Sequence, residues 1–190
     1  RHSFPTRRSS DLHPKKGVDL LIRAYTEFAR SATQSLPVLV IAGPLDSAYA
    51  RDMQDLASSL LPDSGSQLPA PAVLFPGMLS GDAKWGAFHG CQSFILPSHQ
   101  ENFGIAVVEA LACGKQVLIS KQVNIWREII ESEAGWAEDD TLAGTLNLLK
   151  RWDHDAGSGR NLSSEMARKC YQNLYSIENA AQSLKAAIEV

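Results

Sequence analysis

Four short, continuous apolar runs, each ending in a glycine or a serine, alternate with segments of helical period along this chain. The runs are PVLVIAG at 37–43, AVLFPG at 72–77, SFILPS at 93–98 and QVLIS at 116–120. Such runs are typical of strands covered on both faces. The segments around them predict helices over 18–30, around 49–60, over 82–89 and over 104–113. The alternation predicts an α/β fold, a Rossmann-like doubly wound parallel sheet with right-handed crossovers.

The two ends of the chain differ in pattern from this middle part. Beyond Gly135 we predict only helices, through LAGTLNLLKRW and a final helix around 177–188, with a break at DHDAGSG between them. The stretch at 62–71, PDSGSQLPAP, predicts a loop. RHSFPTRRSSDL at 1–12 has no period and looks like a translated sequencing adapter. We interpret 1–12 as a foreign or artefactual arm, or else a natural disordered one, and 13–190 as the folded domain.

Charge and cysteine usage exclude several classes of protein. The formal net charge is −3, and the first twelve residues hold three arginines and one aspartate, so 15 basic and 20 acidic residues remain, a net −5. This balance is against a nucleic-acid partner. Three widely spaced cysteines predict neither a disulfide framework nor a metal site. Without an apolar run of about 20 residues or a signal sequence, we expect a cytoplasmic protein.

Two glutamates with seven residues between them stand in the segment ENFGIAVVEALACG at 101–114. The loop at 98–103 follows a predicted strand, so Glu101 is expected at the carboxyl edge of the sheet, where doubly wound domains bind ligands. Glu109 then lies some 7 Å below the tip of the next helix, within side-chain reach of the same cleft. Since carboxylates only accept hydrogen bonds, the pair suits a ligand rich in hydroxyl donors, such as a sugar or a ribose.

The start of that helix offers the complementary group. Backbone N–H groups at Phe103, Gly104 and Ile105 are expected to be free, and a helix N-terminus with a glycine favours phosphate oxygens. Carboxylates that accept hydrogen bonds from hydroxyls, next to a binding site for an anion, indicate a nucleotide-diphosphate sugar as the ligand. The plainer alternative is that Glu101 only complements the helix dipole and Glu109 lies at a solvated edge.

The run FILPSHQENFGIAVVEALACGKQVLIS resembles the E-x7-E signature of retaining GT-B glycosyltransferases of family 4. The resemblance extends over about 13–188 and includes HPKKGVDLLIRAY, LVIAGP, VLFPGML and VNIWREI. It implies that the chain is the donor-binding half of a GT-B fold. The implied reaction transfers a glycosyl group from a nucleotide-diphosphate sugar to an acceptor hydroxyl with retention of configuration, in surface polysaccharide or glycoconjugate synthesis. It requires no metal and no cofactor.

The resemblance also implies roles for single residues. Glu101 is the catalytic residue beside the transferred sugar, and Glu109 binds the ribose hydroxyls. By the same resemblance, Lys16 and the amides of Phe103, Gly104 and Ile105 bind the diphosphate. Met78 and Leu79 lie against the nucleobase. Asn102, His99 and Gln100 contact the sugar. A lysine suits the diphosphate because negative charge develops on the leaving oxygen.

This sequence departs from the family pattern at its start. Asp11 stands where family members carry an arginine. We expect the preceding strand and the N-terminal, acceptor-binding domain of the family to be missing from this chain. We therefore expect a truncated donor domain, inactive alone, with an apolar face exposed. Its expected partners are the donor, an acceptor glycan or lipid-linked glycan, and the missing N-terminal domain, with the intact protein peripheral at the inner membrane face.

Two other functions fit the same sequence. One is a non-hydrolysing nucleotide-sugar 2-epimerase of GT-B architecture, which would need further acid and base groups that the sequence does not supply. The other is a non-catalytic module that binds a nucleotide or nucleotide sugar.

Overall fold

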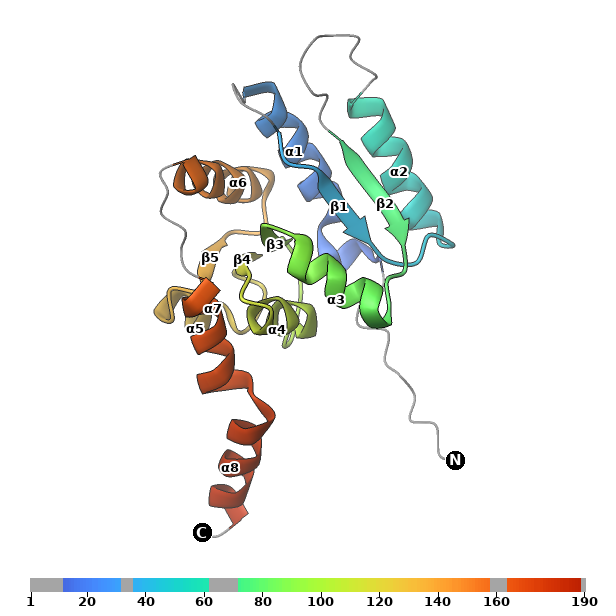
Figure 1. Ribbon diagram of the computed structural model, residues 1–190. Coiled ribbons are helices and arrows are strands. Elements are labelled where there is room, and N and C mark those ends of the chain that lie inside the picture. The colour runs from blue at the N-terminus through green and yellow to red at the C-terminus, as the bar shows by residue number, and fades with distance from the viewer. Residues whose placement is uncertain (1–11, 32–35, 62–71, 158–163, 189–190) are drawn as a thin grey trace.

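Two parallel sheets flanked by helices make up the computed structural model, which describes residues 12–31, 36–61, 72–157 and 164–188 (Figure 1). In the first sheet β1 (Leu39–Ala42) pairs with β2 (Val73–Gly77). The second sheet has the order β3 (Ser93–Leu96), β4 (Gln116–Ser120) and β5 (Gly135–Glu138). All pairs are parallel, which confirms the predicted α/β class.

Helices connect the strands and extend the chain beyond them. They are η1 (Pro14–Lys16), α1 (Val18–Ser31), α2 (Ala48–Leu60), α3 (Gly81–Gly90), α4 (Ile105–Ala112), α5 (Trp126–Glu131), α6 (Leu142–Gly157), α7 (Ser164–Cys170), the π-helical turn η2 (Tyr171–Tyr175) and α8 (Ile177–Ile188). The helices predicted before Gly114 and the final helix are confirmed. In Figure 1, α8 projects away from the body of the domain.

The prediction that the chain is only helical beyond Gly135 is wrong, because Gly135–Glu138 forms β5. The four residues GWAE are too few to show a strand pattern. A side chain at Gly135 would place its Cβ 2.0 Å from the Val117 carbonyl oxygen, so a glycine lets β5 lie directly against β4. The predicted break at 153–159 is also wrong over its first five residues, since α6 continues through Gly157, and its last two residues lie outside the described ones.

One face of β1 is open, although the run was predicted to be covered on both faces. Ile41 is buried against Met53 of α2, whereas Val38, Val40 and Leu74 are 52–54% exposed. Among the described residues, β2 is the only strand that pairs with β1, and no strand joins the two sheets. The exposed valines and leucine match the expectation of an uncovered apolar face.

Helix α1 holds the two sheets together. Ile22 packs in one buried cluster with Ile41 of β1, and Tyr25 and Phe28 pack in a second with Leu149 of α6. Residues partly buried against that second cluster come from both sheets and include Ile95 of β3. Because α1 spans the division between the sheets, its N-terminus and the preceding η1 are placed beside the end of β3.

A third cluster fixes α4 against the second sheet. Val107 and Leu111 of α4 are fully buried with Val117 and Ile119 of β4 and Ile129 of α5. Burial of apolar side chains of this size stabilises a domain by roughly 1.5–3 kcal/mol each. The packing sets the position of the N-terminus of α4 at the carboxyl edge of the sheet.

Some expectations fall outside the described residues. These are the loop at 62–71 and all of the proposed arm except Leu12, including Asp11. Leu12 itself packs against the cluster that contains Val18 and Ile22. In the part of the chain that the structure describes, none of the helices combines the length and the apolar character that crossing a bilayer would require.

Candidate functional site

The short helix η1 and Gly17, together called the loop with Lys16, lie against the end of β3. The Ser98 hydroxyl and the His99 amide both donate hydrogen bonds to the Lys15 carbonyl oxygen, at 2.6 and 2.7 Å. Gly17 has φ +65°, and a Cβ there would lie only 2.1 Å from the Pro97 carbonyl oxygen. This close approach brings Lys16 to the segment that follows β3.

Glu101 is held by backbone on both sides and is paired with Lys16. Its amide donates to the Gln122 carbonyl oxygen at 3.1 Å, and the Asn124 amide donates to the Glu101 carbonyl oxygen at 3.0 Å. The Lys16 ammonium forms an ion pair with Glu101 Oε2, and both side chains are mostly buried, with 25% and 19% of their surface exposed. The sequence predicted Lys16 as a partner of the diphosphate but did not predict this contact.

The N-terminus of α4 is open at Gly104. The Gly104 carbonyl accepts from the amides of Val107 and Val108, at 2.8 and 3.1 Å, and its φ is +70°. No acceptor among the described residues bonds to the amides of Phe103, Gly104 or Ile105, so the predicted free donors are present there. A Cβ at Gly104 would lie 3.5 Å from Glu101 Cγ, which places Glu101 directly beside the helix start.

Glu109 lies one turn further along α4 and is paired with a lysine from α3. Lys84 Nζ lies 2.6 Å from Glu109 Oε1, with 32% and 21% of the two side chains exposed. Lys84 was not predicted as a site residue. The available signal was weak: Lys84 is the only lysine or arginine in the segment 81–90.

The remaining predicted residues also lie at the ends of strands. Met78 and Leu79 follow β2, the former exposed and the latter half-buried, and Asn102 is exposed in the loop before α4. His99 Nδ1 lies 2.9 Å from Asp140 Oδ2, and this hydrogen bond lowers the pKa of Asp140. Asp140 follows β5, so a prediction of that strand would have drawn attention to its carboxylate.

Phe103 connects the site to the C-terminal helices. Its ring meets that of Tyr175 edge to face, with centroids 5.8 Å apart. Tyr175 belongs to η2, and burial raises the pKa of its hydroxyl. The loop before α4, which carries Phe103, is therefore in contact with the segment that leads into α8.

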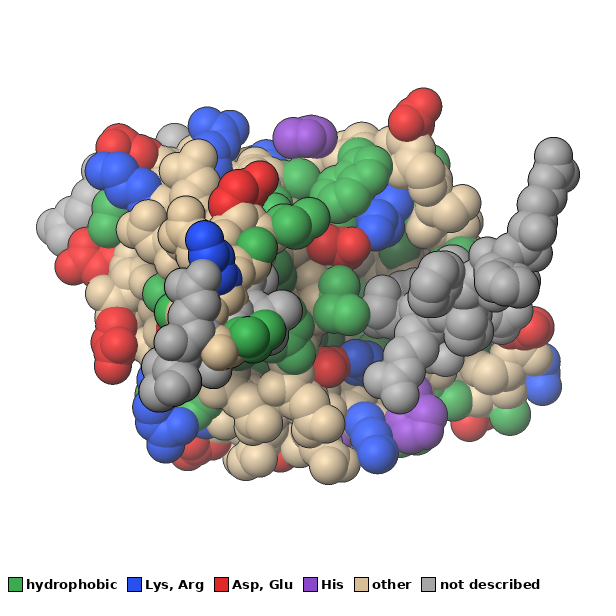
Figure 2. All heavy atoms as spheres, turned by 90° about the horizontal axis from the view of Figure 1, so that it is seen from below, with side chains coloured by type: hydrophobic (Ala, Val, Ile, Leu, Met, Phe, Trp, Pro, Cys, Tyr) green, Lys and Arg blue, Asp and Glu red, His purple; other side chains and the backbone are tan. Residues whose placement is uncertain are grey.

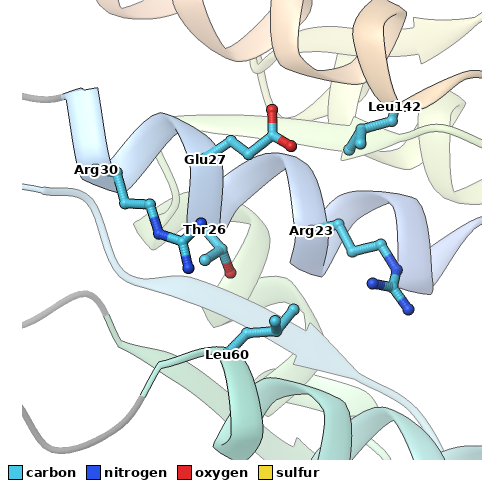
Figure 3. Close-up of a pocket in the computed structure, with 6 residues that line it drawn as sticks. All are labelled: Arg23, Thr26, Glu27, Arg30, Leu60 and Leu142. Atoms are coloured by element: carbon cyan, nitrogen blue, oxygen red, sulfur yellow. The ribbon is translucent and has the colours of Figure 1, made fainter.

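On the face seen from below Figure 1, the described residues present acidic, basic and apolar side chains interspersed, with no extended patch of one charge among them (Figure 2). A pocket of about 220 Å³ lies elsewhere, between α1, the end of α2 and the start of α6 (Figure 3). Its lining is Arg23, Thr26, Glu27, Arg30, Leu60 and Leu142, none of which belongs to the predicted site.

Within the described ranges, no three His, Cys, Asp or Glu side chains gather as metal ligands would.

A match to a known protein family shows to which class this protein belongs. The family described as glycosyl transferases group 1 matches residues 9–148, which is most of the chain and includes both glutamates. The chain belongs to the glycosyl transferases group 1 family. The match covers the loop with Lys16, both sheets and the helix that carries Glu109.

Relatives of known name include glycosyltransferases of different specificity. The chain is 31% identical over 131 residues to a D-inositol 3-phosphate glycosyltransferase of Rhodococcus opacus, covering 67% of this chain and 28% of the relative. It is 27% identical over 174 residues to the lipopolysaccharide 1,2-N-acetylglucosaminetransferase of Salmonella typhimurium, covering 90% of this chain and 44% of the relative. The chain thus spans less than half the length of these relatives.

Solved structures agree on the fold. The Anabaena protein HepE, solved in complex with UDP and glucose, superimposes with a TM-score of 0.75 at 17% identity, over 95% of this chain and 46% of HepE. Sucrose-phosphate synthase from Thermosynechococcus elongatus gives 0.72 at 21% identity, over 93% and 42% of the two chains. The fold is that of the C-terminal domain of GT-B glycosyltransferases, as the sequence predicted.

Proposed function

We propose that this chain binds a nucleotide-diphosphate sugar at the carboxyl edge of its strands, and that the protein transfers the sugar to an acceptor hydroxyl with retention of configuration. One observation carries the proposal. Glu101 lies between the ammonium of Lys16 and the open N-terminus of α4. The carboxylate suits sugar hydroxyls, whereas the cation and the free amides suit phosphate oxygens.

The same three groups suit the charges that develop during glycosyl transfer. As the bond between the anomeric carbon and the diphosphate oxygen breaks, negative charge collects on that oxygen and positive charge on the carbon. Lys16 and the amides at the start of α4, those of Phe103, Gly104 and Ile105, stabilise the oxygen, and Glu101 stabilises the carbon. Because Lys16 and Glu101 already form an ion pair, the two opposite charges lie within reach of a single reacting bond.

The nucleoside occupies the other end of the site in this proposal. Glu109 accepts hydrogen bonds from the ribose hydroxyls, and the loop with Met78 and Leu79 lies against the nucleobase. Asn102 contacts the sugar from the loop before α4. HepE, which shares the fold, was solved with UDP and glucose, and this supports a nucleoside diphosphate as the ligand class.

Since the chain covers 28% and 44% of the two named relatives, we propose that the acceptor binds mainly to a further domain. The names of these relatives mention lipopolysaccharide and D-inositol 3-phosphate. In this proposal the acceptor is a hydroxyl of a glycan or a lipid-linked glycan. Without a facing domain, a site at the edge of the sheet is open to water, where electrostatic stabilisation is weak. We therefore expect this chain alone to bind the donor without turnover.

Replacing Glu109 tests the nucleotide site. We expect Glu109→Ala to weaken binding of the preferred nucleoside diphosphate among UDP, GDP and ADP by about 10- to 100-fold, because hydrogen bonds to a charged acceptor contribute roughly 1.5–3 kcal/mol. Isothermal titration calorimetry on the 190-residue chain measures the loss, and Glu109→Gln keeps the volume of the side chain while removing the charge.

Lys15→Ala is the matched control for that experiment. Its side chain is exposed, and only its backbone carbonyl takes part in the contacts to Ser98 and His99. We expect less than about a threefold change in affinity, as for an ordinary surface substitution. Equal losses for the two variants, or a larger loss for Lys15→Ala, would count against the assignment of Glu109.

A further inference from the structure

Lys84 is the partner of Glu109 in this structure, and the ion pair joins two separate helices, α3 and α4. We propose that Lys84 is a positioning residue that orients the Glu109 carboxylate toward the ribose of the donor. This inference rests on the proposed function. It concerns a residue outside the glutamate segment and assigns it a role in selecting ribose-containing ligands.

The position of Lys84 is itself supported by aromatic packing. Its Nζ lies 4.6 Å from the centroid of the Trp85 ring, a distance at which an ammonium is attracted to an aromatic face. The Trp85 ring contacts Phe88 at 6.1 Å, and Phe88 contacts Phe94 of β3 at 5.7 Å. The aromatic row ties α3 to the second sheet and restricts where the ammonium can lie.

The contact with Lys84 uses only one of the two carboxylate oxygens. Lys84 donates to Oε1 of Glu109, and no other described group hydrogen bonds to this carboxylate. Oε2 is therefore left for a donor from the ligand, and a ribose offers two adjacent hydroxyls. A long glutamate side chain loses rotamer freedom when it is fixed, so orientation by Lys84 lowers the entropy cost of binding the ribose.

This arrangement makes a specific forecast for ligands that lack the ribose hydroxyls. In the unaltered chain, the 2′,3′-dideoxy form of the preferred nucleoside diphosphate should bind about 10- to 100-fold more weakly than the ribose form, the range for hydrogen bonds to a charged acceptor. In Lys84→Ala, Glu109 is less well oriented. The ratio should then fall to roughly 2- to 10-fold, the range for ordinary hydrogen bonds.

The experiment is a set of calorimetric titrations on the full 190-residue chain. UDP, GDP and ADP are titrated first, and the tightest binder is then compared with its 2′,3′-dideoxy analogue. Lys84→Arg should keep most of the discrimination, because it retains a cationic donor. Lys169→Ala is the control, since it removes a lysine that pairs with Glu165 at 2.7 Å within α7. Circular dichroism confirms that each variant is folded.

The outcomes separate this inference from the proposed function. A smaller dideoxy ratio in Lys84→Ala, with Lys84→Arg and Lys169→Ala close to the unaltered chain, supports the positioning role. If Lys84→Ala weakens both ligands equally and leaves the ratio unchanged, Lys84 serves a shared part of the ligand or the fold, and the inference is overturned. Absence of any nucleotide binding by the unaltered chain rejects the proposed function itself.

Discussion

Gly17→Ala is expected to lower the free energy of unfolding by at least about 3 kcal/mol and to abolish measurable nucleotide binding. Gly17 has φ +65°, where a residue with a Cβ costs roughly 1–2 kcal/mol. The Cβ would also lie 2.1 Å from the Pro97 carbonyl oxygen, so the backbone at the end of β3 would have to move. The loop with Lys16 would then lose its place beside Glu101.

Gly81→Ala separates the two causes of that loss. Gly81 also has a positive φ, +52°, but no atom lies within 4 Å of a Cβ built there. Gly81→Ala should lower the free energy of unfolding only by the cost of a positive φ at a residue with a Cβ, about 1–2 kcal/mol. Urea denaturation of both variants measures the difference. If Gly17→Ala were no more destabilising than Gly81→Ala, the close approach of the Lys16 loop to β3 would not be a feature of the protein.

Leu111→Ala is expected to destabilise the domain by about 2–5 kcal/mol. Leu111 is fully buried on α4, in the cluster with Val107 and Ile119. Truncation removes its contacts and leaves a cavity that the surrounding sheet and helices can only partly fill. Since this packing sets the position of the α4 N-terminus, the affinity for a nucleoside diphosphate should fall in the same variant.

Ile130→Ala serves as the control for this substitution. Ile130 is 40% exposed on α5, next to the buried Ile129, so its truncation should cost about 1 kcal/mol or less. Denaturant unfolding, followed by the same spectroscopic signal in both variants, compares their free energies of unfolding. Similar losses at the two positions would mean that α4 is not held by the cluster described above.

The parts of the fold that were predictable are those with a local pattern. The period of apolar residues in 18–30 and the continuous apolar run before Ser120 identify α1 and β4 without knowledge of their neighbours. β5 has no such pattern, since its strand conformation depends on parallel pairing with β4, from Val117 with Gly135 to Ser120 with Glu138. The open face of β1 likewise depends on which strands flank it.

The residues of the candidate site also differ in how far the sequence could predict them. Glu101, Gly104 and Glu109 lie within nine residues of one another, so loop and helix geometry are enough to bring them to one edge. Lys84 and Asp140 reach the site from α3 and from the end of β5, and only tertiary packing places them beside Glu109 and His99. Lysines, aspartates and histidines are common in any sequence, and only the fold determines which of them are in contact.

We propose that the carboxylates of Glu101 and Glu109 and the amides at the start of α4 bind a single nucleotide ligand. A crystal structure of the chain with the tightest-binding of UDP, GDP and ADP tests it most directly. We expect diphosphate oxygens at about 2.7–3.2 Å from the amide nitrogens of Gly104 and Ile105, and ribose hydroxyls on the Glu109 carboxylate. A nucleotide bound instead in the pocket of Arg23 and Arg30, with the two glutamates away from it, would contradict the account.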